Sequence, residues 1–176
     1  MRPKLDYDPP GLCNPKTGET AVKNNAWAFV LLVFAVLWSD GRLAAAPLGA
    51  AEQARAMLER AAVAIKADQG AALQAFNDAR NKSFRDRDLF VYCFNTGDGK
   101  FTAYEMSALI GADIRKFKLY NEPMGQRAYD AVHDAPEGAI VSIDYRMPKP
   151  GEKAPSAKEA FEARVGDQAC GVSYFK

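Results

Sequence analysis

Two helix-type segments precede every strand-type run in this chain, and that order restricts its fold more than any other feature. Residues 51–67 are rich in alanine, and their larger apolar side chains fall on one stripe, which predicts a helix. Asp68 can cap a second helix over residues 70–77, where Leu73 and Phe76 repeat three positions apart. Both predicted helices are complete before the first predicted strand begins.

Strand-type runs begin at residues 89–94, which are apolar on both faces and rich in aromatic side chains. The sequence Asn-Thr-Gly-Asp-Gly separates this run from a second one at residues 100–104, and such Gly-rich turns join hairpin strands. Residues 105–117 are less regular and predict a short helix or turn. Residues 125–132 predict another short helix.

The last part of the chain predicts three more strands. A β-branched run at residues 139–147 ends at a proline, and a loop rich in Pro and Lys follows at residues 149–156. Residues 160–165 alternate in polarity, and residues 169–175 follow the turn Gly166-Asp167. Helices segregated from strands predict the α+β class, with one antiparallel sheet of about five strands and the N-terminal helices packed on it.

An apolar run of 13 residues, from 26 to 38, lies upstream of these elements. It is shorter than the roughly 20 apolar residues of a membrane span and fits the about 7 to 15 of a secretory signal. We therefore predict a disordered leader extension (1–22), a signal peptide (23–50) and a single domain (51–176). A retained single anchor is the alternative for residues 23–50. Either would place the domain outside the cytoplasm, secreted, periplasmic or anchored to the inner membrane facing the periplasm.

The cysteines fit this layout, because Cys13 precedes the apolar run whereas Cys93 and Cys170 follow it. An oxidising compartment favours a Cys93–Cys170 disulfide, which would close a loop of about 78 residues and stabilise the fold by roughly 3 to 5 kcal/mol. Two buried free thiols are the alternative.

Five blocks of the sequence, in this order, resemble the single Cache family of extracytoplasmic sensor modules. They include the strand D-R-D-L-F-V-Y-C-F, the hairpin that begins G-K-F-T-A, the insert A-L-I-G-A-D-I-R, the strand D-Y-R-M-P and the terminus G-V-S-Y-F-K. These blocks span Asp86 to Lys176. Five ordered matches are far more specific than any one of them.

The resemblance implies a PAS-like sheet with a long N-terminal helix on one face and a pocket for a small ligand on the other. Because the chain ends at Lys176 without a second apolar run, it further implies a stand-alone exported form. Two departures fall where the resemblance places pocket walls. Tyr104-Glu105 stand where the family has His-Pro, and Met147 stands where it has Trp, so the identity of the ligand does not transfer.

Lys158 matches the basic residue that precedes the penultimate strand in the family. An ammonium partly shielded from water can fix a carboxylate at one end of a pocket, and the alternative is a solvated loop lysine. Tyr92, Tyr104 and Tyr145 fall on three predicted strands and could form an apolar wall with hydroxyl donors, or could be ordinary core residues. With Met147, these residues make up the predicted ligand-binding set.

Charge and motifs disfavour several other functions. The 23 basic and 22 acidic residues nearly cancel, so nucleic acid is not an expected partner. No G-x-S-x-G, H-E-x-x-H, C-x-x-C or Walker motif occurs, and we expect neither catalysis nor a cofactor. Residues 98–105 imitate the second half of an EF-hand loop, but Phe94 stands where the first calcium ligand belongs. His133, the only histidine, is expected at the surface.

The favoured function is reversible, non-catalytic binding of a small organic acid or similar metabolite, preferably a carboxylate, in extracytoplasmic sensing and signal transduction. The alternative is an exported structural or interaction protein that binds a membrane receptor or forms a homodimer without a small ligand.

Overall fold

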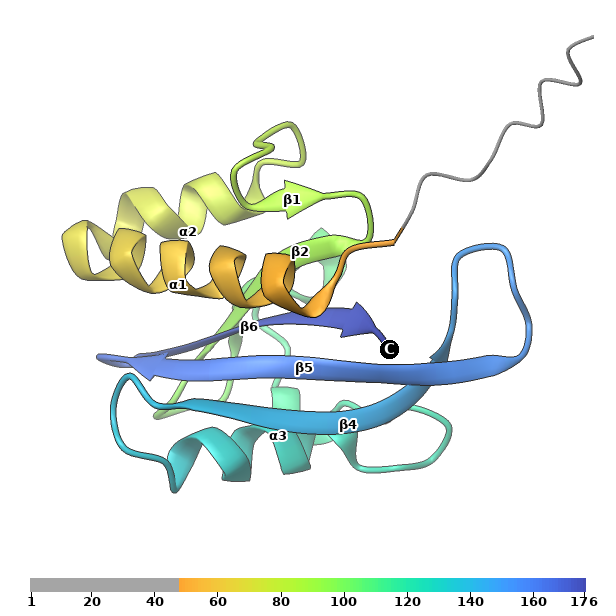
Figure 1. Cartoon of the computed structure of the whole chain (residues 1–176). Coiled ribbons are helices and arrows are strands. Elements are labelled where there is room, and N and C mark those ends of the chain that lie inside the picture. The colour runs from red at the N-terminus through yellow and green to blue at the C-terminus, as the bar shows by residue number, and fades with distance from the viewer. Residues whose placement is uncertain (1–47) are drawn as a thin grey trace, which may run out of the picture. The chain divides into compact units, whose positions relative to one another are not determined.

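The structure is a computed structural model that describes residues 48–176 (Figure 1). The predicted leader extension (1–22) and almost all of the predicted signal peptide or anchor (23–50) lie outside the described residues and stay predictions. None of the helices within residues 48–176 has the length and the apolar character that crossing a membrane requires.

Helices α1 (Ala51–Ala67) and α2 (Gln69–Asn77) confirm the two predicted N-terminal helices. Asp68 separates them, because its backbone is extended and its carboxylate accepts a hydrogen bond of 2.9 Å from the Ala71 amide. Such a cap satisfies an amide at the start of the second helix that would otherwise lack a partner. The apolar stripe of α1, which includes Met57 and Ile65, is buried as the sequence predicts.

The sheet has six strands in the order β1-β2-β6-β5-β4, with β3 paired to β2, and every pairing is antiparallel. This confirms the α+β class, the hairpin and the final three-strand meander. The sequence does not predict β1, which has only two residues. The strands are β1 (Arg85–Asp86), β2 (Leu89–Asn95), β3 (Phe101–Ala103), β4 (Ile140–Pro148), β5 (Pro155–Val165) and β6 (Gln168–Phe175).

Strand β5 corrects the sequence-based boundary, because it begins at Pro155 and not near residue 160. The predicted loop at residues 149–156 is correspondingly shorter. Strand β4 pairs with β5 without interruption, from Ile140 opposite Ala163 to Pro148 opposite Pro155. The segment Ser-Ala-Lys-Glu has little strand propensity of its own, so its conformation is set by the neighbouring strand.

Helix α3 (Met124–His133) and two 3-10 turns, η1 (Ser107–Leu109) and η2 (Ile114–Lys116), fill the chain between β3 and β4. They confirm the short helical elements predicted there. Helix α3 lies on the face of the sheet opposite α1 and α2, so that helices cover both faces (Figure 1).

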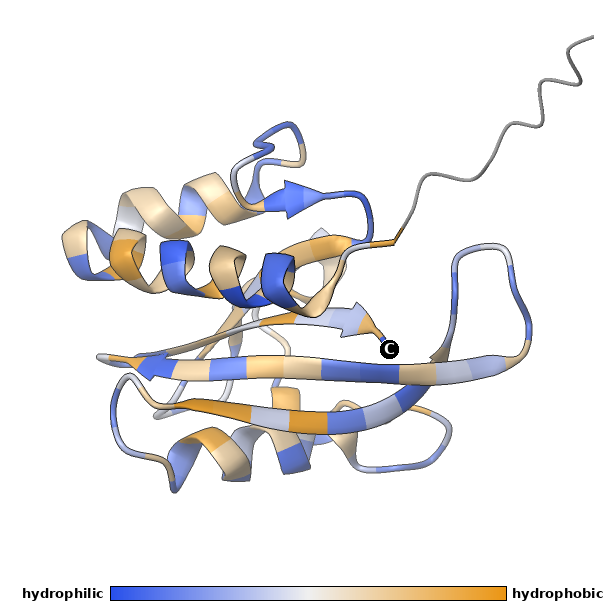
Figure 2. Cartoon of the chain, viewed as in Figure 1, coloured by the Kyte–Doolittle hydropathy of each residue, from blue (hydrophilic) through white to orange (hydrophobic). Residues whose placement is uncertain are grey.

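Alternation along the strands gives the sheet two apolar faces, because successive side chains point to opposite sides. In β2, Val91 and Cys93 belong to the cluster under α1 and α2. Tyr92 and Phe94, one position along, belong to the cluster on the α3 side. Figure 2 shows apolar and polar residues alternating along much of β4 and β5. The buried residues of α1 and α2 belong to the cluster on their side of the sheet.

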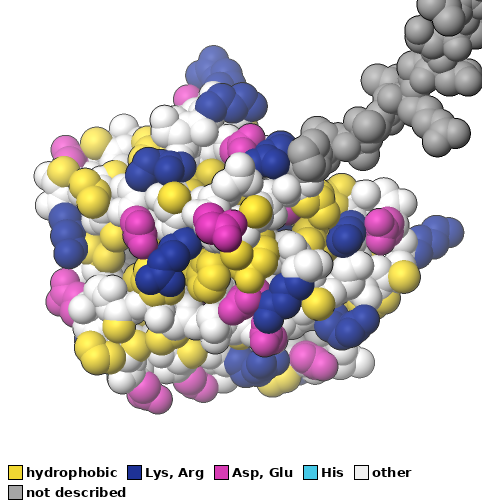
Figure 3. All heavy atoms as spheres, in the orientation of Figure 1, with side chains coloured by type: hydrophobic (Ala, Val, Ile, Leu, Met, Phe, Trp, Pro, Cys, Tyr) yellow, Lys and Arg dark blue, Asp and Glu magenta, His cyan; other side chains and the backbone are white. Residues whose placement is uncertain are grey.

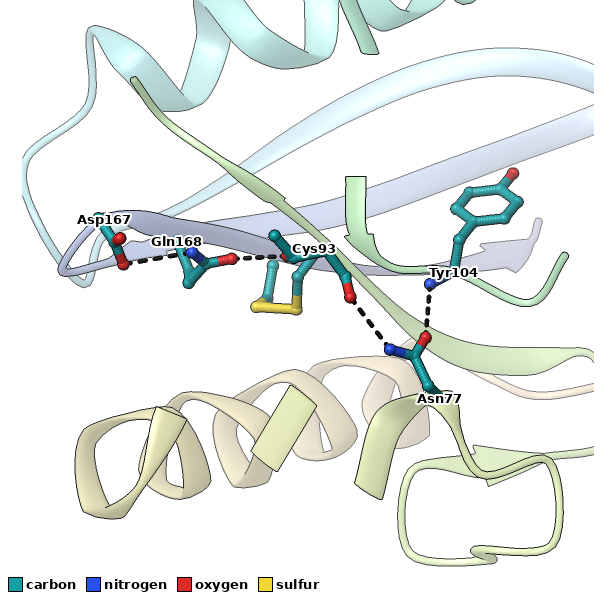
Figure 4. The surroundings of a disulfide bond; sticks show 7 residues. Asn77, Cys93, Tyr104, Asp167 and Gln168 are labelled. Atoms are coloured by element: carbon teal, nitrogen blue, oxygen red, sulfur yellow. Dashed lines mark hydrogen bonds between the residues drawn. A yellow bond between two sulfur atoms is a disulfide. The ribbon is translucent and has the colours of Figure 1, made fainter. Parts of the chain in front are cut away.

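Cys93 and Cys170 form a disulfide beneath α1 and α2, which resolves the two alternatives in favour of the bonded pair (Figure 4). They are directly opposite each other on β2 and β6, with Cα atoms 4.1 Å apart. The next pair along these strands is Tyr92 opposite Gly171. The disulfide therefore fixes the register of the two strands that carry these residues.

Acidic and basic side chains are interspersed over the face of the molecule shown in Figure 3, with apolar atoms between them. This distribution agrees with the near balance of 23 basic and 22 acidic residues.

Candidate functional site

A cavity of about 460 Å³ lies on the α3 side of the sheet. Its floor is the sheet face that carries Tyr92 and Glu162, and its far wall comes from η2 and the first turns of α3, including Ile114 and Ala128. Most of the lining is aromatic or aliphatic, with a few polar groups, which is the composition typical of small-ligand sites.

All five residues of the predicted ligand-binding set line this one cavity. They come from three strands and the residue after a fourth: Tyr92 from β2, Tyr145 and Met147 from β4, Lys158 from β5, and Tyr104 directly after β3. Their strand parity explains the convergence, because Tyr145 and Met147 are two residues apart and share a face. Whether they contact a ligand stays a prediction.

Lys158 is a strand residue, which corrects its expected position in or beside a mobile loop. It is 5% exposed, and its Nζ lies 3.7 Å from Met147 Sδ and 4.4 Å from the centroid of the Phe175 ring. Within residues 48–176 it forms no salt bridge. Burial lowers the pKa of Lys158, and the charges of Asp88 and Glu105 oppose that shift only in part.

Lys158 is therefore a shielded cation whose close neighbours carry no charge. Its cross-strand neighbours are Tyr145 on β4 and Phe175 on β6. A thioether sulfur and an aromatic face are weak partners for an ammonium, whereas a carboxylate would form a charge-assisted hydrogen bond with it. The arrangement suits an anion that enters the cavity.

Glu162 is a site residue that the sequence analysis missed. It is fully buried, and its Oε1 accepts a hydrogen bond from the Tyr92 hydroxyl across Gly171, which lies between them on β6. Its other oxygen, Oε2, is buried without a hydrogen-bond partner. Burial raises the pKa of Glu162 to about 8, and the Tyr92 hydrogen bond offsets only part of that shift. Burial likewise raises the pKa of Tyr92.

A signal for Glu162 was present in the sequence. Lys158 and Glu162 are four residues apart, so both must lie on the same face if they share a strand. The misplaced start of β5 left Lys158 outside the predicted strand and hid this relation.

Between these two polar residues, the floor of the cavity carries small side chains. Ala160 on β5 pairs with Ser173 on β6, and both residues are buried. Tyr145 lines the same cavity as Ser173, and burial raises the pKa of Tyr145. Because Ala160 and Ser173 have small side chains, they leave room for a ligand above the sheet.

Position 171 requires glycine, because the Tyr92 and Glu162 side chains occupy the space that a Cβ would need. A Cβ at this position would lie 2.5 Å from Cζ and Oη of Tyr92 and 2.9 Å from Cγ of Glu162. Gly171→Ala is expected to lower the free energy of unfolding by about 1 to 3 kcal/mol, because the Tyr92 ring would have to move. Chemical denaturation would measure this loss.

Gly70→Ala is the matched control, since a Cβ there meets only the Asp68 carboxylate at 3.5 Å. Alanine is preferred over glycine within a helix, so this change in α2 should be neutral or stabilising. Equal stability of the two variants would contradict the packing described for Gly171.

Tyr104, where the resembled family has histidine, is half-buried and held by α2. The Asn77 side chain accepts a hydrogen bond of 3.2 Å from the Tyr104 amide and donates one of 3.0 Å to the Thr102 carbonyl (Figure 4). The Tyr104 ring packs edge-on against Phe101, with centroids 4.9 Å apart. A residue on the helix side of the sheet thus positions a cavity residue.

Charged residues stand at the edge of the cavity. Arg87, Asp88 and Glu105 line it, and Asp88 Oδ1 accepts a hydrogen bond of 2.7 Å from the Gly49 amide. Asp88 Oδ2 is buried without a partner. Asp88 thereby ties the residues before α1 to the turn between β1 and β2.

The remaining sequence predictions concern residues outside the cavity. His133 is exposed at the end of α3 and stacks on Tyr129, with centroids 5.7 Å apart, which confirms its surface position. The segment that imitates half of an EF-hand comprises the end of the β2–β3 turn, strand β3 and the two residues after it. In the turn, Asn95 Oδ1 accepts hydrogen bonds from the Gly97 and Asp98 amides. These bonds are the turn chemistry of a hairpin.

Several solved structures share this fold. The chain is similar to a periplasmic sensor domain of a chemotaxis protein, with 18% identity over 70% of this chain and 88% of that one, and a TM-score of 0.50. A methyl-accepting chemotaxis protein from Vibrio parahaemolyticus matches with 16% identity, coverage of 70% and 86%, and a TM-score of 0.53. A Cache chemosensory domain described for carboxylic acid recognition matches with 15% identity, coverage of 70% and 91%, and a TM-score of 0.52.

No protein-family model matches this sequence, and no curated protein matches it. The structural matches show a Cache fold of the α+β class, as the resemblance in the sequence predicts. At these identities the likeness concerns the fold alone.

Proposed function

We propose that this chain is a non-catalytic domain that reversibly binds a small carboxylate in an extracytoplasmic sensing role. The observation that carries the proposal is Lys158, a 5% exposed cation that lines an apolar cavity and forms no salt bridge within residues 48–176. An anionic ligand would supply the partner that the protein does not.

The fold supports this proposal. One similar structure is a Cache domain described for carboxylic acid recognition, and another is a periplasmic sensor domain. The disulfide between Cys93 and Cys170 supports a location in an oxidising compartment, because such bonds are rare in the cytosol. The predicted signal peptide or anchor points to the same side of the membrane.

The size of the cavity fits a small ligand. Its volume of about 460 Å³ lies toward the lower end of the range for drug-sized sites, and the half-buried Tyr104 and Tyr145 narrow it. We propose that Lys158 binds the carboxylate, that Met147 and Phe175 shield the ion pair from water, and that the tyrosines contact the carbon chain.

A thermal-shift screen of short carboxylates, with amino acids and amines for comparison, tests the proposal. A ligand at a hundred times its dissociation constant raises the free energy of unfolding by about 2.7 kcal/mol. We expect carboxylates to stabilise the protein and amines to have no effect. A screen in which no carboxylate shifts the melting temperature would contradict the proposal.

Lys158→Met is expected to weaken the binding of the best carboxylate about 10- to 100-fold, because a hydrogen bond to a charged group contributes about 1.5 to 3 kcal/mol. Methionine keeps most of the volume, so the fold should remain intact. Isothermal titration calorimetry would measure the dissociation constant.

Lys153→Met is the matched control, since Lys153 is exposed in the loop between β4 and β5 and does not line the cavity. It makes the same chemical change and alters the net charge equally. The assignment of Lys158 would be wrong if the two variants bound the carboxylate with equal affinity.

A further inference from the structure

The cavity has a second polar group whose hydrogen-bonding capacity is unused. Glu162 is fully buried and lines the cavity, Tyr92 donates to its Oε1, and its Oε2 has no partner. Native proteins pair nearly all buried polar atoms, and an unpaired one destabilises the fold. An apolar residue at this position would avoid that penalty, so the carboxyl group is better explained by a ligand.

We infer that Glu162 is a second recognition group of this cavity, whose Oε2 hydroxyl donates a hydrogen bond to a neutral acceptor on the carboxylate ligand held by Lys158. The inference rests on the proposed function and names the ligand class, a monocarboxylate with a ketone or similar oxygen farther along its carbon chain.

The geometry of β5 places the two groups at opposite ends of one ligand. Lys158 and Glu162 point to the same face, and four residues of strand separate their Cα atoms by about 13 Å. Ala160 and Ser173, which lie between them on the floor, are too small to block a chain that runs along the strand. A ligand that reaches both groups therefore has its acceptor several carbons from the carboxylate.

The surroundings of Glu162 favour a hydroxyl donor over a carboxylate. The titratable groups nearest to it on other strands are the phenols of Tyr92 and Tyr145, and neither offers a positive charge. From α3 the cavity receives only Met124, Gly125 and Ala128. The raised pKa of Glu162 agrees with a protonated group at neutral pH.

Calorimetry with matched acids tests this inference. The probes are 4-oxopentanoate, 5-oxohexanoate and 6-oxoheptanoate, each paired with the unsubstituted acid of equal length, and 5-aminopentanoate as a cationic probe. For at least one pair we expect the oxo acid to bind the wild-type protein about tenfold more tightly than the unsubstituted acid. The unsubstituted acid has no acceptor along its chain, so it leaves the buried Glu162 hydroxyl without a partner.

Two variants separate recognition from packing. Glu162→Gln keeps a donor at this position and should preserve the preference for the oxo acid. Glu162→Leu removes the donor and should abolish the preference, so that the oxo acid and the unsubstituted acid of each pair bind this variant equally well. In the wild type, the infrared band of the protonated carboxyl should shift when the oxo acid binds, and this band should be absent in both variants.

The outcomes distinguish the two proposals. If the paired acids bind equally well and Lys158→Met weakens the binding of both, the carboxylate site stands and the role of Glu162 is wrong. If 5-aminopentanoate binds most tightly and Glu162→Gln abolishes that binding, Glu162 acts as an anion for an ammonium, which overturns the inference. If no carboxylate binds, the proposed function and the inference both fail.

Discussion

Replacing Cys93 and Cys170 together by alanine is expected to lower the free energy of unfolding by about 4 kcal/mol. The disulfide joins residues 77 positions apart, and the chain-entropy model predicts a stabilisation of this size for such a loop. Both cysteines are essentially inaccessible, at 0% and 1% exposure, so small cavities under α1 add to the loss. For a domain of this length the melting temperature should fall by roughly 10 to 20 °C.

Calorimetry of the wild type with and without a thiol reductant provides the comparison. The reduced wild type should approach the double alanine variant in stability, whereas the variant itself should not respond to the reductant. A variant that melts at the same temperature as the oxidised wild type would show that the disulfide contributes nothing to stability.

The disulfide also bears on the candidate site, because it lies on the opposite side of the same strands. Cys93 pairs with Cys170, and the adjacent pair is Tyr92 and Gly171. A slip of one residue between β2 and β6 would turn every side chain to the wrong face. Loss of the disulfide should therefore weaken carboxylate binding as well as stability.

The stability of the protein is expected to decrease by several kcal/mol as the pH rises from about 5 to about 8, because of Glu162. Its pKa is about 8 in the folded protein against an ordinary value of 4.5. Between these values the folded state holds a proton that the unfolded state has lost. A rise in pH therefore favours unfolding, on the order of 1 kcal/mol per pH unit.

The other titratable groups are not expected to mask the loss of stability that Glu162 causes between pH 5 and pH 8. Carboxyl groups whose pKa is lowered, such as Glu159, titrate below this pH range. The only histidine, His133, is exposed. The titratable residues that face Glu162 from the other elements or line the same cavity are Tyr92, Tyr104, Tyr145, Lys158, Arg87, Asp88 and Glu105.

Urea denaturation of the wild type and Glu162→Gln at several pH values measures the contribution. The glutamine variant carries no titratable group at this position, so its stability should change much less between pH 5 and pH 8. Because both proteins keep the other titratable residues, the difference between the two curves belongs to Glu162. Parallel curves would show that Glu162 is ionised in the folded protein throughout this range.

Local sequence patterns determined most of the secondary structure. The alanine-rich stripe of α1, the capping Asp68 and the Gly-rich turn after β2 each act through neighbouring residues, so their effects can be derived without the fold. Periodicity also placed the tyrosines of β2 and β4 on strands. The Cache resemblance then indicated which side of the sheet would hold a cavity and brought Lys158 into the candidate set.

Tertiary structure alone decided the electrostatics of the site. The start of β5 depends on hydrogen bonds from β4, so the sequence of residues 155–159 did not reveal a strand. Consequently Lys158 was taken as a residue beside a loop, and Glu162 was not recognised as its companion. Whether an ionisable side chain is solvated or buried depends on neighbours far along the chain, such as Tyr92 and Phe175, which become neighbours only when the sheet has formed.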